Sequence, residues 1–324
     1  MKPPRKTYWH LGADRRLPSD YEIATSRLLT HVARGGFAVA LPASEFYARH
    51  QAGSLLTSDR FEDFVDPRAT TYTRYVDLGR EREAYVGRLL GSIEESEHDR
   101  QLPPEWLETL GRLLSPLRFA CHGLQMAAAY VGQMAPSGRI AVAALFQCGE
   151  EIRRIQRLAY RLALLARPRP EVAALGRALW QSDPAWQPFR RAIETLLVTY
   201  DWGEALCALN LCLKPAIDDL FFGQLARAAE SAGDHLDAQI LAALGEDAAW
   251  HRAWTDALLD LTFADRPANR AIVARWTGAW APAVEAIGRA GGVLLGSAPR
   301  RTGDDPEAAT TPLPQRPRQG RALG

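Results

Sequence analysis

Apolar side chains recur at intervals of three and four residues along most of the chain from about residue 77 onward. The first series is Tyr85, Val86, Leu89, Leu90 and Ile93, a spacing that places them on one face of a helix. Strand-like alternation is scarce, so the pattern predicts an all-α fold. Helices of about 25 to 30 residues would be roughly 40 Å long, which favours a bundle with long parallel faces. Similar series predict further helices over residues 103–114, 117–134, 137–167, 171–181, 186–200, 201–232, 235–263 and from 267 past 280.

Polar caps and prolines mark the predicted helix ends. Ser137 is expected to cap the helix that runs to about residue 167, and Pro168 is expected to end it. Pro116 follows a serine, and because proline suits a first helical turn, we expect it to start a new helix. Pro215 lies inside the predicted helix over residues 201–232, where its missing N–H predicts a kink.

The first 75 residues are rich in aromatic side chains but show no regular period. The stretch over residues 70–75 does not suit a long helix, so the whole region is predicted to be an extended arm. Its aromatic side chains need a surface to cover. That surface can belong to a neighbouring subunit or to the chain's own domain, and the residue pattern leaves both arrangements open. The candidate subunit-interface residues are Tyr8, Trp9, Phe37, Phe46, Tyr47, Phe61, Phe64 and Tyr72.

The last residues, from about 296, are rich in Pro, Gly and charged side chains and contain few large apolar ones. Such a segment cannot bury enough apolar surface to offset the loss of chain entropy. We therefore predict an extended N-terminal arm over residues 1–75, a helical domain over residues 76–295 and a disordered tail over residues 296–324.

Composition excludes several classes of function. The formal net charge is +1, from 39 basic and 38 acidic side chains, and nucleic-acid binders usually carry a basic excess. No run of about 18 apolar residues is present, so no transmembrane helix is expected, and the N-terminal residues do not resemble a signal peptide. The four cysteines form no CxxC pair and lie in apolar segments. Buried free thiols are therefore expected, as suits a reducing cytoplasm.

Long helical bundles often hold two metal ions. Such a site needs a Glu from each of two helices and a Glu-x-x-His pair from each of two others. The only complete pair is Glu95-Ser96-Glu97-His98, which lies in a charged run typical of a solvated helix end. No phosphate-binding Gly-rich loop and no GxSxG nucleophile motif is present.

Two further stretches contain half of such a pair. In the first, Glu151 has Arg154 three residues later. A guanidinium stays protonated and has no lone pair for a metal, so we expect a buried ion pair between Glu151 and Arg154. In the second, His251 has Ala248 three residues before it, although Asp247 could share its face. The positions Glu151, Arg154, Ala248 and His251 therefore form a degenerate ligand set, and the sequence predicts no metal in this chain.

Several blocks of sequence resemble one known family. They include Tyr8-Trp9-His10-Leu11, Asp66-Pro67-Arg68 and Asp201-Trp202-Gly203-Glu204-Ala205. Together they resemble the beta subunits of the hydroxylase component of bacterial multicomponent di-iron monooxygenases, of the toluene, alkene and phenol type. The resemblance covers residues 7–290, and its other blocks are residues 16–23, 71–72, 122–126, 129–136, 209–211 and 214–215.

The resemblance implies a ferritin-like helical bundle that is a non-catalytic, structural subunit in the cytoplasm. In such enzymes the hydroxylase is a dimer of alpha, beta and gamma subunits, and only alpha holds the di-iron centre. Alpha uses O2 and electrons from NADH to hydroxylate aromatic rings or epoxidise alkenes. The implied partners are alpha, gamma, a small effector protein, and a ferredoxin or NADH reductase. Where alpha subunits carry Glu-x-x-His, this chain has Glu151 with Arg154 and Ala248 with His251.

Two other hypotheses stay open from the sequence. One is a self-contained di-iron oxygenase, which the two incomplete ligand pairs disfavour. The other is a helical scaffold or ligand-binding protein with no oxygenase partner. Iron content would distinguish a self-contained di-iron oxygenase from a structural subunit. Association with a larger helical subunit would distinguish a structural subunit from a scaffold or ligand-binding protein with no oxygenase partner.

Overall fold

The computed structural model describes residues 18–25 and 42–296, which contain helices and loops but no β-strand. The predicted all-α class is confirmed. The long helices are α3 (Tyr72–Glu95), α4 (Pro104–Met134), α5 (Gly138–Leu165), α12 (Asp247–Asp265) and α13 (Asn269–Gly296). The shorter ones are α1 (Asp20–Thr25), α2 (Pro42–Tyr47), α6 (Glu171–Ser182), α7 (Gln187–Leu197), α8 (Trp202–Cys207), α9 (Lys214–Asp218), α10 (Leu225–Ser231) and α11 (His235–Gly245). The 3-10 and π-helical segments are η3 (Ala48–Ala52), η4 (Phe61–Asp63), η5 (His98–Gln101), η6 (Ala208–Leu213) and η7 (Asp219–Gln224).

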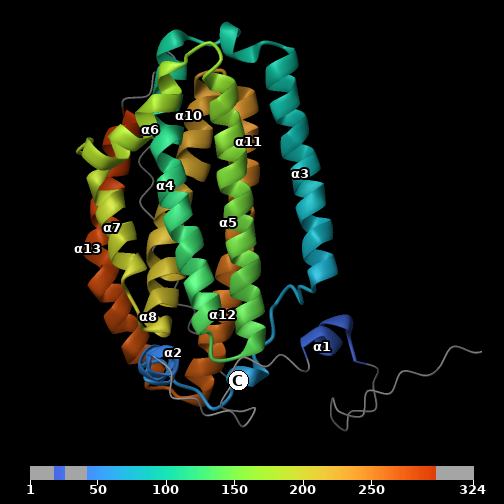
Figure 1. Ribbon diagram of the computed structural model, residues 1–324, viewed down its shortest axis with the longest axis vertical. Coiled ribbons are helices and arrows are strands. Elements are labelled where there is room, and N and C mark those ends of the chain that lie inside the picture. The colour runs from blue at the N-terminus through green and yellow to red at the C-terminus, as the bar shows by residue number, and fades with distance from the viewer. Residues whose placement is uncertain (1–17, 26–41, 297–324) are drawn as a thin grey trace, which may run out of the picture.

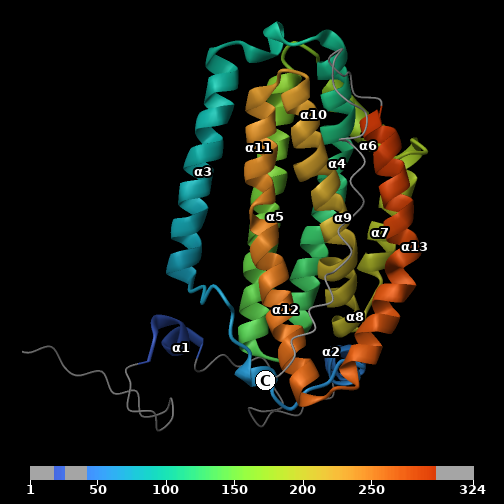
Figure 2. The ribbon, with the colours of Figure 1, turned by 180° about the vertical axis from the view of Figure 1, so that it is seen from behind.

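The centre of the molecule is a bundle of α4, α5, the run from α8 to α10, and the run from α11 to α12 (Figures 1 and 2). Helices α4 and α5 are antiparallel neighbours. Helices α6 and α7 cross over beside α4, so that α5 and the α8–α10 run point in the same direction (Figure 1). Long helices joined partly by a crossover are typical of ferritin-like folds, and no helix in the described residues is long and apolar enough to cross a membrane.

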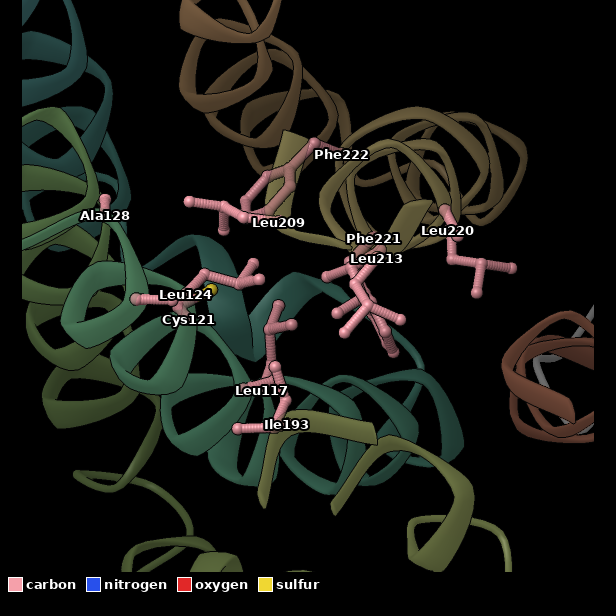
Figure 3. Close-up of a cluster of buried hydrophobic side chains, with 14 of the residues drawn as sticks. Leu117, Cys121, Leu124, Ala128, Ile193, Leu209, Leu213, Leu220, Phe221 and Phe222 are labelled. Atoms are coloured by element: carbon pink, nitrogen blue, oxygen red, sulfur yellow. The ribbon is translucent and has the colours of Figure 1, made fainter. Parts of the chain in front are cut away.

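A continuous apolar core fills the bundle. Leu117, Cys121 and Leu124 of α4 face Leu213 of η6 and Phe221 of η7 (Figure 3). All five are fully buried. The core also buries several indole rings, which supply the largest apolar areas of any side chain. The fully buried ones are Trp106, Trp186, Trp202 and Trp254. All four cysteines are buried and free, which confirms the expectation for them.

The ends of α5 agree with the sequence pattern. The Ser137 side chain accepts a hydrogen bond from the Ile140 backbone N–H at 3.4 Å. That bond satisfies one of the amides that a helix start leaves without an intrahelical partner. The helix ends at Leu165, close to the prolines that were expected to stop it.

Helix α4 corrects one prediction. It is continuous from Pro104 to Met134, with Pro116 inside it, whereas we expected two helices that met at this proline. An internal proline removes one backbone hydrogen bond. Here the flanking turns bury Leu113, Leu114 and Leu117 on the core, and this packing holds the helix together across the missing bond.

Helix α3 corrects a second prediction. It begins at Tyr72, so residues 72–75 are helical, and the proposed boundary at residue 75 falls inside the helix. The Thr71 side chain caps it by accepting a hydrogen bond from the Arg74 N–H at 3.3 Å. The Tyr75 ring stacks on Phe146 of α5 at 4.5 Å between centroids. Capping and this tertiary contact outweigh the weak strand preference of the local residues.

The predicted helix over residues 235–263 is divided into α11 and α12 at Glu246. The backbone carbonyl of Leu244 accepts a hydrogen bond from Nε of Arg154 at 3.1 Å. Helix regularity is therefore interrupted where a buried side chain of α5 reaches the backbone.

The predicted helix over residues 201–232 consists of α8, η6, α9, η7 and α10 in succession, so its helix type changes along its length. Two π-helical segments, η6 and η7, lie on either side of the short helix α9, which carries Pro215 near its start. Widened turns of this kind are rare and frequently occur at functional sites. Here they frame Lys214 and Asp218, the first and last residues of α9.

Residues 42–71, which lead into α3, cross the base of the bundle (Figure 1). The Gln51 amide donates to the carbonyls of Met134 and Ala135, at 3.0 and 2.9 Å. The Ser54 hydroxyl donates to Asp201 at 2.6 Å, and Leu56 is fully buried. Much of residues 48–70 therefore packs on the chain's own domain, one of the two arrangements that the sequence left open.

Candidate functional site

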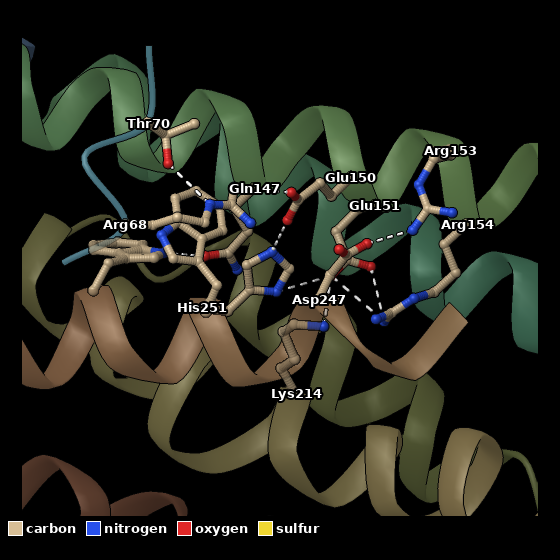
Figure 4. Close-up of polar contacts among 12 residues, drawn as sticks. Arg68, Thr70, Gln147, Glu150, Glu151, Arg153, Arg154, Lys214, Asp247 and His251 are labelled. Atoms are coloured by element: carbon tan, nitrogen blue, oxygen red, sulfur yellow. Dashed lines mark hydrogen bonds and ion pairs between the residues drawn. The ribbon is translucent and has the colours of Figure 1, made fainter. Parts of the chain in front are cut away.

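Helix α5 places charged side chains inside the bundle. Its buried residues include Glu150, Glu151, Arg153, Arg154 and Arg161. A charged group in a low-dielectric interior must be paired or it becomes very costly. These five side chains are therefore expected to define the polar contacts of the interior, and Figure 4 shows how four of them lie against neighbouring helices.

Four of the buried groups close into a ring, which we call the central ring: Glu151, Arg154, Lys214 and Asp218. Nη1 of Arg154 lies 3.1 Å from Oε2 of Glu151 and 2.8 Å from Oδ1 of Asp218. Nζ of Lys214 lies 2.6 Å from Oε1 of Glu151 and 2.8 Å from Oδ2 of Asp218. Each cation thus touches both carboxylates, and the formal charge of the ring is zero.

Ion pairing within the ring shifts the pKa values of Asp218 and Arg154 in favour of their charged forms. Burial alone would raise the pKa of Asp218, but the Arg154 guanidinium and the Lys214 ammonium outweigh it and lower that pKa below its usual range. Burial opposes the charge of Arg154 as well, yet Asp218 and Glu151 raise its pKa. The guanidinium also lies 4.3 Å from the centre of the Phe222 ring, a cation–π contact. Asp218 and Arg154 therefore stay ionised around neutral pH.

His251 lies beside the ring. Its Nε2 is 2.7 Å from Oε2 of Glu150, whose other oxygen is 3.2 Å from Nη2 of Arg68. Nδ1 of His251 is buried, has no hydrogen-bond partner in the described residues, and lies 3.9 Å from Oε1 of Glu151. Burial and the nearby Lys214 cation hold the pKa of His251 well below its usual value, so the imidazole is neutral.

A second set of ion pairs connects α3 to the bundle. Asp247, at the start of α12, pairs with Arg153 and with Arg82 of α3. Glu83 of α3 lies 3.5 Å from Nη1 of Arg153 and also pairs with Arg157. These pairs link α3 to both α12 and α5, in addition to the few apolar side chains that α3 buries.

A third set, which we call the end cluster, lies at the far end of α5 and comprises Arg161, Asp99, Asp237, Asp234 and His98. Nε of Arg161 donates to Oδ1 of Asp237 at 2.8 Å, and its Nη2 donates to Oδ1 of Asp99 at 2.6 Å. Nε2 of His98 lies 2.9 Å from Oδ1 of Asp234. Burial raises the pKa of Asp237 to about 7, against the lowering effect of Arg161.

The central ring does not fit a di-metal centre. Arg154 and Lys214 are donors without a lone pair at neutral pH, and they lie between the carboxylates that a metal would need. Ala248 has no ligand atom, which leaves His251 without a glutamate at the matching position. Within residues 18–25 and 42–296, no group of three or more His, Cys, Asp or Glu side chains has the geometry of a metal site. His98, from the complete Glu-x-x-His pair, is hydrogen-bonded to Asp234.

The chain matches the Methane/Phenol/Alkene Hydroxylase family over residues 44–266. It is 33% identical over 290 residues to the beta subunit of the toluene-4-monooxygenase hydroxylase component of Ectopseudomonas mendocina, with 87% of this chain and 88% of that protein covered. This chain belongs to the Methane/Phenol/Alkene Hydroxylase family.

One more relative and two solved structures show how far the likeness extends. The small subunit of the propane 2-monooxygenase hydroxylase component of Mycolicibacterium goodii is 28% identical over 55% of this chain and half of its own length. A structure of toluene 4-monooxygenase with toluene bound in the resting active site superposes with a TM-score of 0.83 at 32% identity, covering 91% of this chain and 99% of that one. Phenol hydroxylase from Pseudomonas sp. OX1 has a TM-score of 0.80 at 21% identity, covering 92% and 93%, which supports the fold alone.

The predicted subunit-interface residues of this family member separate into distinct groups. Tyr8, Trp9 and Phe37 lie outside the described residues. Tyr72 and Phe46 remain candidates, because their exposed fractions are 73% and 36%.

The remaining three face this chain's own bundle to different degrees. Tyr47 is partly buried and its hydroxyl contacts Gln133. Phe61 is partly buried and packs edge-on against Trp202, with 5.5 Å between ring centroids. Phe64 was wrongly assigned to an interface: it is 1% exposed within this chain alone, so it has no surface left for a neighbour.

Several residues of the site were missed by sequence reasoning. Lys214 and Asp218 complete the central ring, and the one available signal was their spacing of four residues beside Pro215. Arg161, Asp99 and Asp237 were missed because they belong to three separate elements. The one sequence signal for these residues was their charge within otherwise apolar helical stretches.

Proposed function

We propose that this chain is the non-catalytic beta subunit of the hydroxylase component of a multicomponent monooxygenase. The supporting observation is the central ring, in which Arg154 and Lys214 stand between the carboxylates of Glu151 and Asp218. The two cations balance the two carboxylates of the ring, and no lone pair is available at Arg154. The likeness to the toluene-4-monooxygenase beta subunit supports the same assignment.

The proposed reaction belongs to the whole complex and not to this chain. A di-iron centre in an alpha subunit would use O2 and electrons from NADH to hydroxylate an aromatic hydrocarbon or epoxidise an alkene. This chain's own residues would form a rigid helical body against which alpha and gamma assemble. An effector protein and a ferredoxin or reductase would complete the system, in the cytoplasm, where the four free thiols stay reduced.

Iron content tests the proposal. The chain expressed alone is expected to contain no stoichiometric iron after reconstitution with Fe(II), because both cations of the ring would have to be displaced. Elemental analysis of the purified chain measures this directly. Two irons per chain at full occupancy would instead support a self-contained oxygenase.

Assembly tests the other half of the proposal. Co-expressed with its cognate alpha and gamma subunits, the tagged chain should recover both, and the reconstituted complex should turn over only when all three are present. Recovery of the chain alone under the same conditions would favour a helical scaffold or ligand-binding protein with no oxygenase partner.

A further inference from the structure

Helix α5 is polar inside and uncharged outside. Its exposed positions are Leu145, Ile152, Gln156, Tyr160 and Ala163, and none of them carries a charge. The exposed fraction is 50% for the Leu145 side chain and 42% for Ile152. A solvated helix usually shows the reverse arrangement, with charged residues outward. Water is therefore a poor partner for the outer face of α5.

Helix α4 continues the same surface. From residue 113 to its end, its exposed positions are His122, Met126 and Gln133, and again none is Asp, Glu, Lys or Arg. The two helices pack side by side (Figure 1), with α6 and α7 on one flank and α3 on the other. We call this surface the uncharged face.

The uncharged face ends in a group of aromatic rings. Tyr130 follows Met126 by one helical turn, and its hydroxyl donates to the Tyr200 carbonyl at 2.5 Å. The Phe46 ring lies 5.7 Å from the Tyr200 ring, and Tyr200 is 45% exposed. Interface centres are depleted of charge and enriched in Met, Tyr and Phe, and this is the composition of the uncharged face.

Other helices of the chain differ. Helix α3 exposes seven charged residues over its 24 positions: Arg74, Asp77, Arg80, Glu81, Arg88, Glu94 and Glu95. The back of the bundle, formed by α11 and α12 (Figure 2), exposes Glu246, Arg252 and Asp260. Helix α11 also exposes no Asp, Glu, Lys or Arg, but its exposed positions are only His235, Gln239 and Ala242. The α4–α5 surface combines eight such positions on two adjacent helices.

The size of the uncharged face fits a stable interface. Leu145 to Ala163 spans five helical turns, about 27 Å, and two packed helices with axes 8–10 Å apart present a strip about 20 Å wide. Including the aromatic rings, the area is on the order of 600–800 Å². A standard protein–protein interface buries about 800 Å² on each partner.

We propose that the uncharged face is the docking surface for the alpha subunit of the hydroxylase, a partner that must itself present an uncharged helical surface. This inference rests on the proposed function, because the alpha subunit is the larger chain with which a beta subunit shares its component. The charged interior of α5 then has a second consequence. The charged side chains of α5 are paired inside the bundle, so its outer surface has no charge that a partner would have to remove from water.

Substitution tests the proposal in the complete complex. The chain carrying Leu145→Glu and Ile152→Glu is co-expressed with its cognate alpha and gamma subunits and recovered through a tag. We expect at least a tenfold loss of recovered alpha, with the thermal unfolding curve of the isolated chain unchanged, because both positions are solvent-exposed. The matched control is Ala253→Glu on the exposed back of α12, which should recover alpha at the wild-type level.

Cysteine labelling gives a second readout that does not depend on a disruptive change. The four native thiols are buried, and burial raises the pKa of Cys121 and Cys212 to about 12, so they react slowly with maleimide. A single Ile152→Cys should be labelled rapidly in the isolated chain and at least tenfold more slowly in the complex. Ala253→Cys should be labelled at the same rate in both.

The outcomes separate the docking surface from the proposed function. If the wild-type chain recovers no alpha, the proposed function and the docking surface both fail. If the wild type recovers alpha but the double variant does so equally well, or Ile152→Cys stays reactive in the complex, only the docking surface is wrong. Concentration-dependent protection of Ile152→Cys in the isolated chain would assign the face to a second copy of this chain and overturn the proposal.

Discussion

The central ring and the end cluster are two solutions to the same problem, which is how to keep carboxylates inside a bundle. Both are built around arginines of α5. The ring matches two carboxylates, Glu151 and Asp218, with two fixed cations. The end cluster sets three aspartates against one arginine and one histidine. One set is balanced by permanent charges, and the other is not.

This difference decides where protons are held. In the ring, the cations keep the pKa of Asp218 low, so no proton is needed near neutral pH. In the end cluster, Arg161 cannot compensate for three carboxylates, and burial raises the pKa of Asp237 to about 7. The hydrogen bond to Asp234 raises the pKa of His98 as well. The ring should therefore be insensitive to mild pH changes, and the end cluster should respond to them.

The largest expected effect comes from unbalancing the ring. Arg154→Ala leaves Glu151 and Asp218 with Lys214 alone, and one buried negative charge is then uncompensated. Removal of one partner from such a pair costs about 3–5 kcal/mol in the free energy of unfolding. Chemical denaturation of the isolated chain measures the loss.

The control removes one charge of each sign. Arg154→Met combined with Glu151→Leu leaves Lys214 paired with Asp218 at 2.8 Å, and replacement of a buried pair by apolar groups is often neutral. The double variant should unfold within about 1 kcal/mol of the wild type. Equal stabilities of the single and double variants would mean that charge balance does not hold the ring together.

The second effect is a pH dependence that originates in the end cluster. Asp237 keeps a proton in the folded chain up to about pH 7, whereas an unfolded aspartate loses it near pH 4. The folded state binds more protons in between, so the free energy of unfolding must fall as pH rises through this window. From pH 6 to pH 8 the expected decrease is about 1–1.5 kcal/mol, measured by urea denaturation at each pH.

A matched variant assigns that slope to one residue. Asp237→Asn resembles the protonated aspartic acid, because its amide can donate a hydrogen bond while its oxygen accepts from Arg161. Stability at pH 6 should be close to that of the wild type, and the decrease toward pH 8 should largely disappear. A variant that keeps the full wild-type slope would show that the proton resides elsewhere.

Much of the fold was predictable because the sequence pattern of a helix involves residues that are close together in the chain. The apolar period and the Ser137 cap of α5 are properties of neighbouring residues, and the structure agrees with them. The errors occurred where distant contacts decided the outcome. Pro116 stays helical because the turns around it pack on the core, and α11 ends where Arg154 reaches the Leu244 carbonyl. No local pattern contains that information.

The site divides in the same way. Glu151 and Arg154 are three residues apart on one helix, so the sequence alone suggested that they meet. Asp218 is 64 residues from Arg154 and reaches it only through the fold. Asp237 is 76 residues from Arg161. Local spacing can therefore predict the Glu151–Arg154 pair. The pairs that involve Asp218, and all those of the end cluster, depend on which helices become neighbours.

The smallest expected effect separates His98 from Asp237. The hydrogen bond from His98 to Asp234 raises the imidazole pKa, although partial burial opposes this. A raised histidine pKa adds stability that is fully present below about pH 6.5 and is lost as pH rises through the folded value. His98→Gln keeps a donor for Asp234 but cannot titrate. It should lower the free energy of unfolding at pH 6 by less than about 1 kcal/mol.

Above the folded pKa of His98 the His98→Gln variant should be as stable as the wild type, since the wild-type imidazole is then neutral. Its slope between pH 6 and pH 8 should lie between those of the wild type and Asp237→Asn, because the two groups titrate in the same direction. An NMR titration of the His98 ring protons gives the independent check. A pKa at or below 6.5 would show that Asp234 does not stabilise the imidazolium, and the pH response of the end cluster would then belong to Asp237 alone.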